Sequence, residues 1–274
     1  MIFLSVLAIS CEEKQENDEI DFTTDINTIL DESVLSYIFD DVFTQTGLAL
    51  TLAEEVLETD NSSDQVIIRD ICPQITVTPA NLTEWPKTVV LDYGNEGCFD
   101  NEVVKKGRIL MDVSDRFFVE GSTWIIEFES YSLENLSVTG TKTVTFNGRN
   151  DFDFFNWDIN VNDAMITTPG QTIITWESQH NRQLIDGENS PFNSEYDEYL
   201  IAGTSSGVNS SGWRYAITIT EPLNLQVGCP WVRSGRLHLE TARRSDAYVD
   251  FGGGDCNSTI IITIEGMSRS VNLF

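Results

Sequence analysis

The pentapeptide Gly-Thr-Ser-Ser-Gly at residues 203–207 resembles a catalytic motif more closely than any other part of the sequence. It fits the G-x-S-x-G pattern, in which a serine on a strand-to-helix turn is the nucleophile of a hydrolase. Glu221 and His238 follow in the chain order that a serine–acid–histidine triad would need. However, a strand-like segment at 213–220 comes next, with no helical pattern. We therefore expect a loop between two strands, and a hydrolase that uses Ser205 is the alternative.

A short acidic segment is the second candidate for chemistry. Its four aspartates are Asp151, Asp153, Asp158 and Asp163. Alternate carboxylates on one strand face could bind Ca²⁺ as a cofactor or act as the acids of a hydrolase. The spacing fits no EF-hand loop, and a chain with 44 acidic residues brings some carboxylates together by chance. We expect the aspartates on the solvent side of a strand and Phe152, Phe154 and Trp157 on its buried side.

Histidines and tryptophans give weaker indications of a site. His180 and His238 are the two histidines of the chain, too few for a three-histidine zinc site. Exposed tryptophans on a sheet can stack on sugar rings, although single tryptophans more often pack in a core. Trp85, in an expected loop, and Trp213, beside an expected turn, are therefore the candidates for contact with a glycan.

The sequence contains five cysteines, of which one lies near the N-terminus and four lie in the β-rich part of the chain. Cys11 follows an apolar leader, and the remaining four are Cys72, Cys98, Cys229 and Cys256. An even number in an exported protein predicts disulfides, and four cysteines allow three connectivities. Proximity in the sequence favours Cys72–Cys98 and Cys229–Cys256. A zinc site is the alternative, but the sequence contains no C-x-x-C pair.

Residues 1–10 are typical of a lipoprotein signal peptide. The run is too short to span a bilayer, which needs about 20 apolar residues, and it ends in small residues before Cys11. We expect cleavage before Cys11 and acylation of its thiol. The alternative is a secretory leader whose cysteine is incidental. Residues 11–25 are acidic, with Lys14 as their only basic residue, and are expected to form a solvated tether.

The formal net charge of −28 limits the partners of this chain. Nucleic acids and anionic membrane surfaces require clustered lysines and arginines, so we expect neither as a ligand. Contact with a membrane is then expected only through the lipid anchor. A glycan or an envelope protein fits this surface better.

Apolar residues recur at helical spacing from 26 to 58 and predict an amphipathic helix. Gly47 is expected to break or kink this helix. Two aromatic residues, Phe39 and Phe43, make its stripe too apolar to remain in water. We expect the stripe to pack on the rest of the chain.

The pattern changes to period two over residues 65–274, with β-branched and aromatic residues between glycine, asparagine and proline clusters. The predicted fold class is all-β: an antiparallel meander forming a sandwich or a partly open barrel, with the N-terminal helix packed on it. The stretch 179–193 lacks this alternation and is expected to be a loop.

The β body contains two similar units, 72–113 and 229–265. Each has a Cys-Pro dipeptide upstream of a matching segment, LDYGNEGC in the first and VDFGGGDC in the second. Asp92 and Asp250 are expected to cap the glycine turns that follow them. The two units also contain the tripeptides Gly-Arg-Ile and Gly-Arg-Leu.

These motifs resemble, in their order along residues 1–265, a family of Bacteroidota, chiefly flavobacterial, surface lipoproteins. The resemblance implies a lipid-anchored protein of the outer membrane that is exposed at the cell surface. It implies no activity, because the shared motifs are structural: turns, disulfide-forming cysteines and the first residues of strands. We therefore expect a non-catalytic binding or envelope-structural role. Besides the hydrolase, a lipid-binding clam whose helix covers an apolar concavity is a further alternative.

Overall fold

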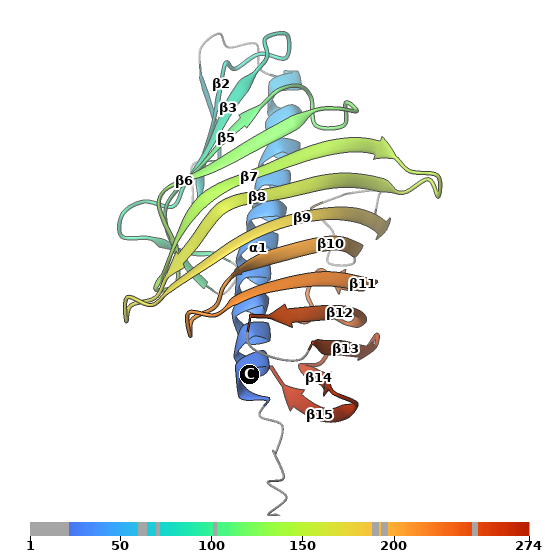
Figure 1. Ribbon diagram of the computed structural model, residues 1–274. Helices are drawn as coiled ribbons and strands as arrows, with labels where there is room; N and C mark the ends of the chain where they lie inside the picture. The colour runs from blue at the N-terminus through green and yellow to red at the C-terminus, as the bar shows by residue number, and fades with distance from the viewer. Residues whose placement is uncertain are drawn as a thin grey trace, which may run out of the picture.

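The computed structural model of the 274-residue chain describes residues 22–59, 65–69, 72–100, 103–187, 192, 197–242 and 246–273. One long helix, α1 (Thr23–Thr59), precedes fifteen strands (Figure 1). The predicted signal peptide, Cys11 and nearly all of the predicted tether lie outside the described residues.

All fifteen strands belong to one antiparallel sheet. Each pairs with the next along the chain, except that β4 pairs only with β5, which itself continues the path from β3. The two end strands, β1 and β15, are not paired with each other. The predicted antiparallel meander with one N-terminal helix is confirmed, and its single sheet is not closed. The strands are β1 (Val66–Arg69), β2 (Gln74–Thr78), β3 (Lys87–Asp92), β4 (Cys98–Asp100), β5 (Val103–Val113), β6 (Thr123–Leu133), β7 (Leu136–Arg149), β8 (Phe155–Thr167), β9 (Ile173–Asp186), β10 (Glu198–Val208), β11 (Arg214–Gln226), β12 (Ser234–Thr241), β13 (Ala247–Gly253), β14 (Thr259–Ile264) and β15 (Met267–Asn272).

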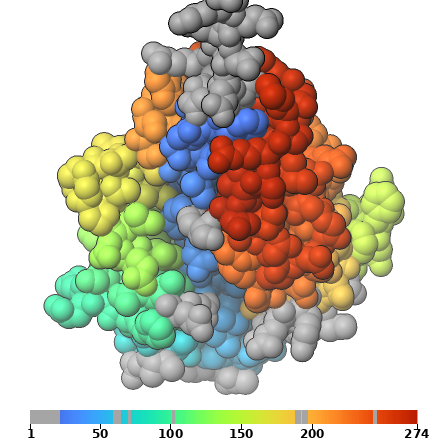
Figure 2. Space-filling model, turned by 90° about the horizontal axis from the view of Figure 1, so that it is seen from below, coloured from blue at the N-terminus to red at the C-terminus, as the bar shows by residue number. Residues whose placement is uncertain are grey.

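The sheet curves around the helix, so α1 lies against its inner face (Figure 1). Figure 2 shows α1 flanked by green and yellow strands on one side and red strands on the other. Four strands carry a glycine with positive φ at a register shift: Gly107, Gly140, Gly203 and Gly235. Such bulges bend a strand and increase its twist. They explain how so wide a sheet can wrap around one helix.

The core lies between α1 and the inner face of the sheet. Leu35, Ile38, Val42 and Phe43 are fully buried and lie on one face of the helix. Among the residues of α1 whose burial the structure describes, only Thr23, Tyr37, Glu55 and Glu58 are exposed, so the helix is enclosed rather than merely covered on one side. Within the described residues, no helix combines the length and apolarity needed to cross a bilayer.

The expected break at Gly47 is wrong, because α1 continues through it. A Cβ at this position would collide with the ring of Phe192, which packs on the helix there. The glycine is needed for close packing and does not interrupt the helix.

Both favoured disulfides are present. The Cα atoms of Cys72 and Cys98 are 6.0 Å apart, and those of Cys229 and Cys256 are 5.8 Å apart. Both separations fall within the normal range for a disulfide.

The predicted turn caps are also present. The backbone N–H of Gly94 donates to Asp92 Oδ1 at 2.8 Å, and that of Gly252 donates to Asp250 Oδ1 at 2.8 Å. The second oxygen of each aspartate accepts from an arginine, with Arg108 Nε at 2.7 Å from Asp92 and Arg236 Nε at 2.8 Å from Asp250. The arginine of each Gly-Arg tripeptide therefore binds the aspartate that caps the turn of the same unit. The sequence alone did not predict this contact.

Candidate functional site

Polar side chains gather in two places that could carry function. One set lies in the interior, between α1 and the inner face of the sheet. The other lines a shallow groove on the outer face, over β8 to β11.

Glu32 of α1 is the centre of the first interior cluster. It is only 8% exposed and accepts three hydrogen bonds, from Ser205 Oγ at 2.7 Å and from Tyr215 and Trp176 at 2.9 Å each. Burial raises the pKa of Glu32, although the three donors oppose this effect. The donors come from β9, β10 and β11, so the cluster fixes the helix to three strands.

Lys105 of β5 forms the second interior cluster. Its ammonium group lies 2.8 Å from Asp41 of α1 and 2.9 Å from Asp100 of β4, and its side chain is 0% exposed. Burial raises the pKa of Asp41, and the Lys105 charge opposes this effect. The cluster joins the helix to both β4 and β5.

Lys142 and Arg182 form the third cluster, near the middle of the helix. Arg182 binds Asp40 at 2.5 Å, and the Lys142 ammonium group donates to the carbonyl of Phe39. Burial lowers the pKa of Lys142 to about 7 and that of His180 to about 4. A lysine with a pKa this low can serve as a base or nucleophile, but Lys142 is 1% exposed beneath α1. The three interior clusters hold the helix in place and are closed to a substrate.

The structure does not bring the residues of the candidate triad together. Ser205 faces inward, where it donates to Glu32. Leu237 and Leu239 are buried, so the alternation along β12 places His238 on the outer face. Glu221 binds Arg236 at 2.7 Å.

The loop expected at 203–207 is also wrong, because the whole pentapeptide lies inside β10. Its first glycine occupies a bulge of that strand, and its serines continue the alternation of inner and outer faces. A strand rich in glycine and serine has weak β propensity, which is why its sequence resembled a loop.

We expect Ser205→Ala to lower the free energy of unfolding by about 1–2 kcal/mol, because Glu32 loses one of three buried donors. Urea denaturation of this variant would measure the loss. Ser206→Ala is the matched control, since Ser206 occupies the next position on the opposite face, and its change should stay within about 0.5 kcal/mol. A fluorophosphonate probe should label neither the native chain nor the variants. Labelling that disappears in Ser205→Ala would instead support a serine hydrolase.

The four candidate aspartates do not form one cluster. Asp151 and Asp153 lie in the turn between β7 and β8, whereas Asp158 and Asp163 lie on β8 itself. Phe152 is 77% exposed at that turn, so the expectation that it is buried is wrong. Among the described residues, no group of three or more histidine, cysteine, aspartate or glutamate side chains is arranged to hold a metal ion.

The two candidate tryptophans lie away from the groove. Trp85 is half-buried and donates from Nε1 to the carbonyl of Leu82 at 3.2 Å, while the Lys87 ammonium lies 4.6 Å from its ring centroid. Trp213 is half-buried beside the β10–β11 turn, where its backbone N–H donates to Asn209 Oδ1 at 2.9 Å.

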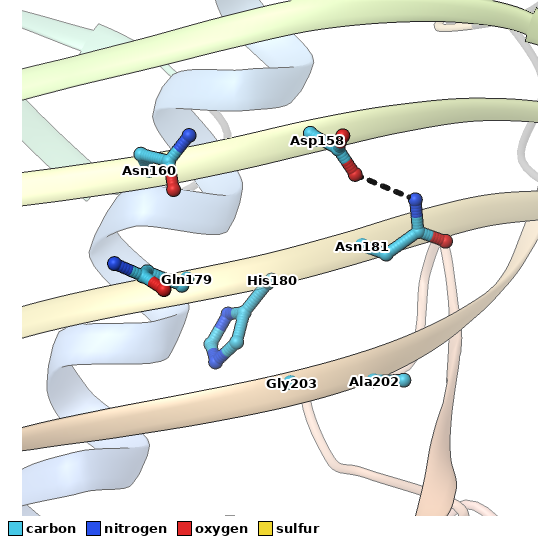
Figure 3. A pocket seen from close by; sticks show the side chains of 7 residues that line it. All are labelled: Asp158, Asn160, Gln179, His180, Asn181, Ala202 and Gly203. Atoms are coloured by element: carbon cyan, nitrogen blue, oxygen red, sulfur yellow. Dashed lines mark hydrogen bonds between the residues drawn. The ribbon is translucent and has the colours of Figure 1, made fainter.

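The outer groove consists of two adjoining hollows. The first has a volume of about 420 Å³, and Figure 3 shows it from the outer face, with α1 behind the strands. Asp158 and Asn181 point toward one another and share a hydrogen bond of 2.8 Å. The second hollow, of about 300 Å³, shares Gln179 with the first. The first hollow is lined by Asp158, Asn160, Gln179, His180, Asn181, Ala202 and Gly203.

Strand alternation places the polar groups of the groove. Trp157, Ile159 and Val161 are buried on the inner face of β8, so the side chains of Asp158 and Asn160 face outward. The loop expected at 179–193 is wrong in its first part, because β9 continues to Asp186. Amides and hydroxyls at alternate strand positions were the signal that could have located this groove.

Comparisons of the chain with protein-family models, with curated proteins and with solved structures found no match.

Proposed function

We propose that this protein is an exported lipoprotein, anchored through Cys11 and exposed on the outer membrane, with a non-catalytic binding or envelope-structural role. The pairing of the cysteines is the observation that carries this proposal. The four cysteines after Cys11 pair with one another, which leaves Cys11 as the remaining thiol of the chain. Two disulfides are also typical of a protein that folds in an oxidising compartment.

The arrangement of the body supports the same role. The helix begins at Thr23, close in sequence to Cys11 and at one end of the molecule (Figure 1). An anchor attached there would leave the outer face of the sheet accessible. The inward-facing Ser205 and the enclosed Lys142 favour binding or structure over catalysis.

Acylation is tested by expressing the native chain and Cys11→Ser in a Bacteroidota host and extracting both with Triton X-114. We expect the native chain in the detergent phase, because more than one acyl chain gives stable attachment, and Cys11→Ser in the aqueous phase. The mass of the native N-terminal peptide should include the acyl groups. A double variant, Cys229→Ser with Cys256→Ser, is the matched control and should remain in the detergent phase.

Two results would contradict separate parts of this proposal. If Cys11→Ser partitions like the native chain, the anchor is not at Cys11. If protease added to intact cells leaves the native chain uncut but cuts it after lysis, the protein is anchored but not surface-exposed.

A further inference from the structure

The outer groove lies within a longer row of side chains that crosses the sheet. The register aligns Asn160 of β8 with Gln179 of β9, and Gln179 with Thr204 of β10. The same row continues through Thr218 of β11 and His238 of β12. Because side chains alternate between faces, aligned residues of an antiparallel sheet project from the same face. The row is therefore a continuous polar surface.

Small residues on β10 and β11 make this surface concave. Ala202, Gly203 and Ala216 line the hollows and leave space between the longer side chains of β9 and the neighbouring strands. A Cβ at Gly203 would collide with the carbonyl oxygen of Gln179, so the strand bulge itself requires glycine there. Bulges are over-represented next to binding and active sites, and the two hollows adjoin this one.

The groups that line the groove suit a ligand rich in hydroxyls. Asn160 and Gln179 each offer a carbonyl acceptor and an amide donor, and Thr204 and Thr218 can both donate and accept. A sugar hydroxyl also donates and accepts, so each group can pair with it. The carboxylates Asp158 and Glu177 add acceptors.

Charge selects among such ligands. The two carboxylates and the net charge of −28 disfavour an anionic saccharide, such as a uronate or a sulfated glycan. A neutral saccharide meets no such repulsion.

An exposed aromatic side chain lies at the far end of the row. Tyr248 of β13 is aligned with His238, is 54% exposed and stacks on the imidazole with ring centroids 4.8 Å apart. Gln179 and Tyr248 are separated by four strand spacings, roughly 19 Å. This length exceeds a single sugar ring and fits a chain of several.

We propose that the outer face over β8–β11 binds a neutral oligosaccharide, which lies across the strands with its hydroxyls in the groove and one end toward Tyr248. The inference rests on the binding role proposed above and specifies its ligand class and residues. It does not require the lipid anchor, so the two proposals can fail separately.

The test uses the full chain carrying Cys11→Ser. Binding is first surveyed on an array of short neutral oligosaccharides built from glucose, mannose, galactose or xylose, with oligogalacturonates as the acidic arm. Isothermal titration calorimetry then measures the best neutral ligand. We expect Gln179→Ala to weaken binding at least about tenfold and Ala202→Phe, which fills the first hollow, to abolish it. Tyr248→Ala should weaken longer oligosaccharides more than disaccharides.

Thr88→Ala is the matched control, because the exposed Thr88 belongs to β3, four strand spacings from β8, and lines neither hollow. Its affinity should equal that of the unsubstituted chain. Each variant should keep its thermal unfolding midpoint within about 2 °C, which separates loss of binding from loss of folding. The inference is overturned if no neutral oligosaccharide binds, if acidic ones bind as well, or if Ala202→Phe binds normally. Anchoring through Cys11 would remain in any of these cases.

Discussion

Replacing Lys105 with methionine is expected to lower the free energy of unfolding by about 3–5 kcal/mol, the loss typical of removing one partner from a buried ion pair. The substitution keeps the length of the side chain but leaves Asp41 and Asp100 without the ammonium group that lies between them. Both carboxylate side chains are only 11% exposed, so water compensates little of the lost interaction. Thermal and urea denaturation with the disulfides intact would measure the change.

The destabilisation should depend on pH. Burial already raises the pKa of Asp41, and removal of the Lys105 charge should raise it further in the folded state. A folded carboxyl with a raised pKa holds a proton that the unfolded chain releases, so stability is lost as the pH rises from about 4 toward the folded pKa. The difference between native chain and variant should therefore be larger at pH 8 than at pH 5.

Two controls separate charge from packing in this prediction. Lys106→Met changes the neighbouring, half-buried lysine of β5, and its effect should stay near 0.5 kcal/mol. The triple variant Lys105→Met, Asp41→Asn, Asp100→Asn removes the uncompensated charges and should recover much of the lost stability. A loss that is equal for Lys105→Met and Lys106→Met, or independent of pH, would contradict the role of the buried charge cluster.

The sequence contained most of the information needed for the class of fold. The period-two pattern of the body, the apolar helix and the pairing of the four cysteines all depend on local alternation or short separations, which a sequence shows directly. The capping of the turns by Asp92 and Asp250 was predictable for the same reason, since the bonds join residues two positions apart.

The enclosure of α1 by the sheet was not predictable, and neither were the interior clusters. The curvature comes from bulges such as that at Gly203, and glycine in a strand looks like a turn signal. The sequence did not predict the buried positions of Lys105 and Lys142, because their acceptors on α1 are distant in the sequence. The groove was missed for a related reason: it depends on register between strands, which period two alone does not determine.

The second large effect is expected at Phe43, whose replacement by alanine should cost about 3–5 kcal/mol. Its ring is fully buried and lies 5.7 Å from that of Trp157 and 5.1 Å from that of Phe192. The Arg182 guanidinium lies 4.6 Å from the ring centroid, so the variant also loses a cation–π contact. Phe43→Leu, which retains most of the volume, is the matched control and should cost clearly less than the alanine variant.

The unfolding of Phe43→Ala would test whether α1 is part of the folded core or a separate cover over the concave face of the sheet. Side chains of α1 fill the concavity of the sheet, and buried contacts from Phe43, Glu32 and Asp41 reach strands along its length. We therefore expect one cooperative transition, in which amide hydrogen exchange of α1 and of the central strands is accelerated by the same factor. Faster exchange in the helix alone, together with binding of an apolar dye, would show that α1 can leave an intact sheet. That result would favour the lipid-binding alternative, in which the concavity is a binding site and the helix its cover.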